Sequence, residues 1–132
     1  GRTQDVVMLL HRHLPHLDVH VDGMGKRVAK IHLEHGGFLR DSNELERAWR
    51  WVKRVGSKSD KKKALNGNVI VTTSGMLSGG PALWYLNRLR EDRRNAIFFR
   101  SIVLFRTDGY NSLFLIYEFL SKFKQIFITL FA

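Results

Sequence analysis

One stretch of the sequence has the residue types and the spacing to hold a phosphate. Residues 69–73 read Val-Ile-Val-Thr-Thr, a β-branched run that suits a buried parallel strand. A loop with three glycines follows, and Pro81 then fits the first turn of a helix. Such a strand, loop and helix direct the unpaired N–H groups of the helix N-terminus towards the ligand crevice of an α/β fold. The pattern indicates a phosphate or nucleic-acid contact, although many glycine-rich turns of this kind bind nothing.

Six histidines raise the question of a metal site. His11 and His13 are close in sequence to two further histidines, but residues two apart do not share a helix face, and Pro15 interrupts the segment. His32 and His35 are better explained as one face of a helix. We therefore assign the histidines to surface, capping or packing roles, and we expect no metal-binding and no catalytic residue in this chain.

Tryptophan and basic residues offer a second kind of nucleic-acid contact. Indole rings stack on bases in proteins that bind single strands. Trp49 falls on the apolar stripe of a predicted helix, whereas Trp51 lies off that stripe and is expected to be exposed; Trp84 is a third candidate. Basic residues surround the same helix, namely Arg47, Arg50, Lys53 and Arg54. A positive face with one exposed indole is compatible with RNA contact and equally with an interdomain surface.

The composition limits the class of protein. The chain has 132 residues, of which 44% are hydrophobic and 11% aromatic, enough for one packed domain and too apolar for disorder throughout. A formal charge of +10 favours polyanionic partners, although it also suits a solubilising surface. The absence of cysteine excludes disulfides and thiolate metal sites, and we expect a cytoplasmic protein.

The remaining patterns alternate between helix and strand. Apolar spacing predicts helices that precede and follow a strand at residues 18–22, in which alternate residues should be buried. The expected helices cover residues 5–13, 26–35, 43–55 and 81–90, the expected strands cover 18–22, 69–73 and 96–99, and residues 56–63 form an exposed basic connection. This order predicts an α/β class with a Rossmann-like parallel sheet flanked by helices, in which a right-handed crossover joins the strands at 69–73 and 96–99.

Particular residues go further than the spacing. Residues 69–81, the helix after them and the run Asp92–Phe99 closely resemble the β-CASP region of metallo-β-lactamase-fold ribonucleases. The similarity is greatest to archaeal relatives of the cleavage and polyadenylation specificity factor, which process RNA 3′ ends. Residues 1–4, Gly-Arg-Thr-Gln, and residues 19–24, Val-His-Val-Asp-Gly-Met, fit the same family in the expected order. The resemblance covers about residues 1–99, which we expect to form the β-CASP domain segment.

The resemblance implies an RNA-cleaving parent enzyme. Family members use zinc held by a His-x-His-x-Asp-His motif and other ligands of a metallo-β-lactamase portion, and this chain has none of those motifs. We therefore expect the segment to clamp RNA beside an active site that it does not contain. The expected RNA-binding residues, some of them in a loop that needs small residues in any case, are Arg2, Ser74, Gly75, Met76 and Ser78.

The expected partners are RNA, the remainder of the metallo-β-lactamase domain and a second copy of the chain. Two alternatives remain at this stage. In the first alternative, the chain is a non-catalytic Rossmann-like nucleic-acid-binding module. In the second, it is a broken gene product that binds nothing specifically.

The composition changes near residue 100. Eight of the nine phenylalanines lie at or beyond Phe98, and the expected Gly-Tyr-Gln continuation of the family is missing. We expect residues 100–132 to be a divergent apolar tail, frame-shifted or non-native. Residues 113–132 are long enough for a membrane span, but Glu118, Lys122 and Lys124 would each oppose insertion by about 2.5–3.5 kcal/mol. We predict no membrane contact, and a helix or a non-native tail instead.

Overall fold

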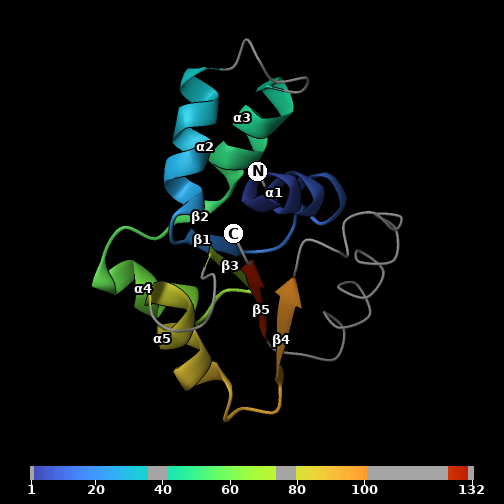
Figure 1. Ribbon diagram of the computed structural model, residues 1–132. Helices are drawn as coiled ribbons and strands as arrows, with labels where there is room; N and C mark the ends of the chain where they lie inside the picture. Colours follow the sequence, from blue (N-terminus) through green and yellow to red (C-terminus); the bar gives the residue numbers. More distant parts are fainter. Residues whose placement is uncertain (1, 36–41, 74–79, 101–124, 131–132) are drawn as a thin grey trace.

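The fold is an α/β sandwich around a parallel sheet. The computed structural model describes residues 2–35, 42–73, 80–100 and 125–130 (Figure 1). The helices are α1 (Arg2–His13), α2 (Gly25–Glu34), α3 (Ser42–Trp51), α4 (Lys58–Ala64) and α5 (Gly80–Leu89). The strands are β1 (Val19–Asp22), β2 (Lys53–Arg54), β3 (Val69–Thr73), β4 (Asn95–Arg100) and β5 (Gln125–Leu130).

The sheet has five strands in the order β2-β1-β3-β5-β4, and every neighbouring pair is parallel. In the register of the central strands, Val19 lies opposite Val69 and Asp22 lies opposite Thr72. Helices α1, α2 and α3 cover one face of the sheet, and α4 and α5 cover the other (Figure 1). The predicted class, a Rossmann-like parallel sheet flanked by helices, is confirmed.

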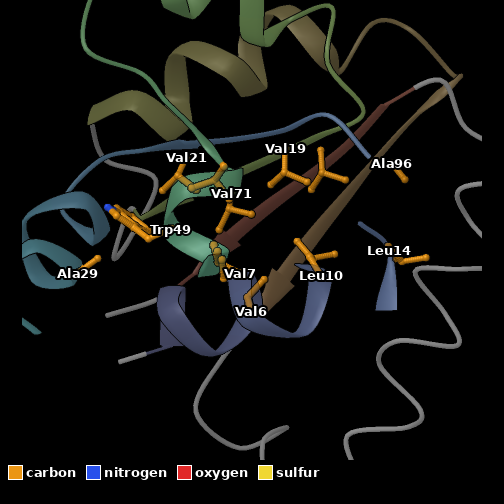
Figure 2. Close-up of a cluster of buried hydrophobic side chains, with 13 residues drawn as sticks. Val6, Val7, Leu10, Leu14, Val19, Val21, Ala29, Trp49, Val71 and Ala96 are labelled. Atoms are coloured by element: carbon orange, nitrogen blue, oxygen red, sulfur yellow. The ribbon is translucent and has the colours of Figure 1, made fainter. Parts of the chain in front are cut away.

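Strand β3 supplies the core on both faces. Val69 and Val71 join the cluster under α1, α2 and α3, while Ile70 points to the opposite cluster with Tyr85 and Leu89 of α5. Figure 2 shows the first cluster, in which α1 packs against the sheet. Its labelled members are Val6, Val7, Leu10, Leu14, Val19, Val21, Ala29, Trp49, Val71 and Ala96. A strand covered on both faces needs apolar residues at consecutive positions, which is why the β-branched run predicted β3 correctly.

The predicted alternation in β1 is wrong, because all four of its residues are buried. Helices cover both faces of this strand as well, so the polar residues His20 and Asp22 are inside the fold. His20 Nε2 lies 3.2 Å from Asp18 Oδ2, which confirms a packing role for this histidine. Partial burial of Asp18 is outweighed by its hydrogen bonds with Lys53 and His20, so its pKa lies below the ordinary value.

The segment after Trp51 is a strand, where a helix to residue 55 was expected. In the pairing of β2 with β1, Lys53 lies opposite His20 and Arg54 lies opposite Val21. The Val55 N–H donates to the Val21 carbonyl at 3.0 Å. The backbone groups at the free edge of β1 pair with this segment. The pairing can be predicted only when the position of β1 in the sheet is known. Val52 and Val55 are therefore buried beside the sheet instead of continuing the helical stripe.

The basic connection expected at residues 56–63 is mostly exposed, as predicted, but it contains helix α4, where a linker was expected. Ser57 starts the helix with a capping box, in which the Asp60 N–H donates to Ser57 Oγ at 3.1 Å and the Ser57 N–H donates to the Asp60 carboxylate at 3.0 Å. The lysines of α4 lie at the surface, while Ala64 is buried in the cluster with α5. The capping box and the buried alanine both stabilise this short helix.

Ser57→Ala is expected to lower the free energy of unfolding by about 1 kcal/mol, since it removes the acceptor for one unpaired helix N–H. Hydrogen bonds with Ser57 and with the Gly56 N–H hold the pKa of Asp60 below its ordinary value. The capping box therefore stabilises the fold above the unfolded pKa of Asp60, and this stability is lost as pH falls through the lowered folded pKa. Urea unfolding at neutral and acidic pH measures both effects. Ser59→Ala is the control, because this exposed serine of α4 makes no cap; an equal loss in the two variants would contradict the capping role.

Residues 125–130 form β5, where a helix or a non-native tail was expected. The strand lies between β3 and β4. Its residue Ile126 lies opposite Val69 of β3 on one side and opposite Ala96 of β4 on the other. The two strands of the predicted crossover are thus parallel but not adjacent. Residues 101–124, 131 and 132 of the expected tail lie outside the described residues. Within the described ranges, no helix has the length and apolar character to cross a membrane.

Candidate nucleic-acid interface

The carboxyl edge of the sheet gathers the segments that the sequence singled out. Strands β1 and β3 are parallel and therefore end at the same edge, at Asp22 and Thr73. Gly23 turns the chain out of β1 with a φ of 88°, in the left-handed region that favours glycine. A side chain at this glycine would meet Thr73, since an added Cβ would lie 2.6 Å from Thr73 Oγ1. The two strand ends are therefore in direct contact.

The structure describes only one of the five predicted RNA-binding residues, Arg2. Arg2 is the first residue of α1, and the neighbouring Thr3 packs so closely on Gly25 that an added Cβ there would lie 2.6 Å from Thr3 Oγ1. The first turn of α1 thus lies beside the start of α2, next to the turn after β1. Ser74, Gly75, Met76 and Ser78 lie outside the described residues, between the end of β3 and the start of α5. Their contact with RNA stays a prediction.

A buried polar network supports this edge. Asp22 Oδ1 accepts from the Gly23 N–H at 2.7 Å and from Lys26 Nζ at 3.2 Å, and Asp22 Oδ2 accepts from the Tyr85 hydroxyl at 3.0 Å. Lys26 Nζ also donates to the Val55 carbonyl. Burial, together with the charge of Asp22 and the hydrogen bond to it, raises the pKa of Tyr85, which stays protonated and donates. The network joins β1, α2, α5 and the segment after β2 into one unit.

Three buried polar atoms at the ends of β3 and α1 lack a hydrogen-bond partner within the described part of the chain. They are Gln4 Nε2, Thr72 Oγ1 and Thr73 Oγ1. Such atoms are normally paired in folded proteins, so an amide donor and two hydroxyls remain open to bonding near the strand ends. Gln4 belongs to the Gly-Arg-Thr-Gln segment that was singled out from the sequence. No role was predicted for Gln4 or for the two threonines.

The tryptophans do not form a base-stacking surface of the kind considered from the sequence. Trp49 is in the core, as expected. Trp51 is only partly exposed: its Nε1–H donates to the Pro15 carbonyl at 3.0 Å, and its ring contacts His11. Trp84 is half-buried, and the Arg88 guanidinium lies 3.7 Å from its ring centroid. Each indole is thus engaged within the fold.

The described residues do not fit a zinc centre. No group of three histidine, aspartate or glutamate side chains comes together to hold a metal in residues 2–35, 42–73, 80–100 and 125–130. Zinc prefers a tetrahedral set of such ligands. The histidines of α1 are used differently, for example in the ring contact of His11 with Trp51.

A parallel sheet covered on both faces defines a Rossmann-like α/β domain, a class in which ligands commonly bind at the carboxyl edge of the sheet. Such domains differ widely in function, so the particular residues must identify the family. The chain belongs to the β-CASP family, because the family model described as "Beta-Casp domain" matches residues 3–109. The match continues beyond residue 99, where the resemblance in the sequence was expected to end.

Curated relatives come from archaea. The chain is 35% identical over 101 residues to "Probable RNase MJ4" of Methanocaldococcus jannaschii, a match that covers 73% of this chain and 24% of the relative. It is 34% identical over 111 residues to "RNase aCSPSF2" of Saccharolobus solfataricus, covering 83% and 22%. It is 32% identical over 117 residues to "Transcription termination factor FttA" of M. jannaschii, covering 75% and 18%. The chain thus spans about a quarter or less of the length of these relatives, and no solved structure matches it.

Proposed function

We propose that this chain is the β-CASP portion of a zinc-dependent RNA-cleaving enzyme that acts in RNA 3′-end processing or decay. In that enzyme the segment would hold an RNA strand beside the active site. The main support is the family match, joined to the position of the end of β3, directly before Ser74, at the carboxyl edge of a parallel sheet. Two relatives are named as RNases, which is compatible with this activity.

RNA would be held at this edge by four loop residues and by Arg2. The loop between β3 and α5 contains Ser74 and Ser78, whose hydroxyls can donate to phosphate oxygens, while Gly75 and Met76 would present backbone N–H groups. Arg2 would add a cation from the first turn of α1. The hydroxyls of Thr72 and Thr73 lie at the end of β3, which leads into this loop, and the open donor of Gln4 lies in the first turn of α1 beside Arg2.

The zinc ligands would belong to the remainder of the metallo-β-lactamase domain. A stripe of exposed apolar residues gives that domain a surface on which to pack. Met24, Val28 and Ile31 are spaced along one side of α2 and are 66%, 37% and 54% exposed. We further propose a cytoplasmic location and a homodimer of the whole enzyme.

The 132-residue chain is expected to bind single-stranded RNA and to leave it uncut. Binding should weaken steeply with salt, because the contacts are to phosphates. Fluorescence anisotropy with a labelled oligouridylate measures affinity, and a denaturing gel of the same RNA, with and without added zinc, measures cleavage. Ser74→Ala combined with Ser78→Ala should weaken binding several-fold, with Ser59→Ala as the control. Absence of RNA binding would overturn the proposed role.

Cleavage provides the second test. Chelator-sensitive cleavage by the 132-residue chain would contradict our assignment of the zinc ligands to other parts of the protein. The full-length protein is expected to cleave the same RNA in a chelator-sensitive manner. If it binds RNA but does not cleave it, the alternative of a non-catalytic nucleic-acid-binding module would hold.

A further inference from the structure

A basic groove runs between α2 and α3. It consists of two hollows of about 530 and 450 Å³ that share Leu33, Trp49 and Arg54. We call it the α2–α3 groove. Its lining residues are Lys26, Arg27, Lys30, Leu33, Glu34, Ser42, Glu46, Trp49, Arg50 and Arg54.

The charges of this groove are unevenly paired. Glu34 is neutralised by Lys30 at 3.8 Å, and Glu46 is neutralised by Arg50. Arg27 and Arg54 are exposed and have neither an ion pair nor a side-chain hydrogen bond in the part of the chain that the structure describes. The groove therefore contains two guanidinium groups with open donors, and its carboxylates are already occupied.

The groove is continuous with the carboxyl edge of the sheet. Lys26 lines it and is also bonded to Asp22, where β1 ends, and to the carbonyl of Val55, which follows Arg54. Helix α2 starts at this edge and extends for ten residues, which corresponds to about 15 Å. The groove therefore begins beside the end of β1.

We propose that the α2–α3 groove binds the phosphate backbone of a single-stranded RNA, as an extension of the carboxyl edge at which β1 and β3 end. This inference rests on the proposed RNA-binding function. Arg27 and Arg54 each contact a phosphate, for which the planar guanidinium provides two parallel N–H donors. Trp49 forms the floor but is only 5% exposed, so it offers no ring for stacking on bases. Binding in the groove is therefore electrostatic and tolerant of sequence.

The experiment is RNA binding by the 132-residue chain, with an oligouridylate as the probe at several salt concentrations. Arg27→Ala and Arg54→Ala should each weaken binding about fivefold to tenfold and lower the slope of log affinity against log salt by about one. Arg27→Lys should restore most of the salt slope. The matched control is Arg93→Ala, since Arg93 is exposed, has no ion pair within the described ranges, and precedes β4 at the amino edge of the sheet. Circular dichroism verifies that each variant is folded.

The outcomes separate the groove from the proposed function. If the wild type binds RNA and the groove variants bind as tightly as Arg93→Ala, the groove assignment is overturned and the loop assignment stands. If the wild type does not bind RNA, both fail. If polyglutamate binding is sensitive to Arg27→Ala while RNA binding is not, the groove holds an acidic protein segment, and the proposal is wrong. Loss of RNA binding confined to Arg27→Ala and Arg54→Ala supports it.

Discussion

Asp22→Ala is expected to lower the free energy of unfolding by about 3 kcal/mol, the largest effect of any single polar substitution at the carboxyl edge. The carboxylate of Asp22 is 6% exposed and accepts from the Gly23 N–H, from Lys26 and from the buried hydroxyl of Tyr85. Its removal leaves the Gly23 N–H and the Tyr85 hydroxyl without this acceptor. It also leaves a half-buried ammonium without its counter-charge.

Urea or thermal unfolding of the purified chain measures this loss. Tyr85→Phe removes one hydrogen bond and keeps the ring, so it should lower the free energy of unfolding by only about 1–2 kcal/mol. The double variant should lose less than the sum of the two single losses, because the substitutions act on one shared contact. An Asp22→Ala variant as stable as the wild type would show that the network does not support the edge.

Gly23→Ala is expected to lower the free energy of unfolding by about 3 kcal/mol, through two separate effects. The φ of 88° is unfavourable for any residue with a Cβ, and that Cβ would lie 2.6 Å from Thr73 Oγ1 and 3.1 Å from the Thr73 carbonyl oxygen. Because the backbone of Thr73 cannot move without disturbing β3, the clash is not relieved by a side-chain rotation alone. Gly56→Ala is the control, since its added Cβ has only an ordinary 3.7 Å contact with Asp60.

The same substitution connects stability to binding. Thr73 directly precedes the loop that contains Ser74 and Ser78, so a displaced Thr73 should weaken RNA binding under conditions where the variant is still folded. Binding measured at low temperature, with circular dichroism on the same sample, separates the two effects. A folded Gly23→Ala variant with wild-type affinity would mean that the strand end does not position the loop.

The elements that the sequence predicted well are those whose signals are local. The β-branched run of β3 and the proline at the start of α5 define their own conformations, as does the apolar spacing of α1. The pairing of β2 depends instead on the free edge of β1, which no pattern in residues 53–54 indicates. Helix α4 is a different case. Ser57 and Asp60 have the spacing of a capping box, but the lysine run between residues 61 and 63 suggested a solvated linker.

The candidate site was predictable only in part. Matching motifs located the loop after β3 and the turn after β1, and the parallel order of these strands brings them to one edge. The bond from Tyr85 to Asp22 joins residues 63 positions apart, and it arises only from the packing of α5 on the sheet. The burial of His20 and Asp22 was missed for the same reason, because a strand with polar residues at alternate positions is typical of a half-exposed sheet.

The position of β5 between β3 and β4 has a consequence for how the domain acquires its structure. During synthesis β3 and β4 leave the ribosome well before β5, the strand that separates them in the sheet. In the finished sheet, Ile126 of β5 lies opposite Val69 of β3. Until residues 125–130 have been synthesised, one edge of β3 has no partner among the described strands. Strand β4 then has no described neighbour at all. Long-range parallel pairing of this kind is slow and leaves strand edges open to association. The nascent domain should therefore depend on chaperones during the interval in which its sheet is incomplete.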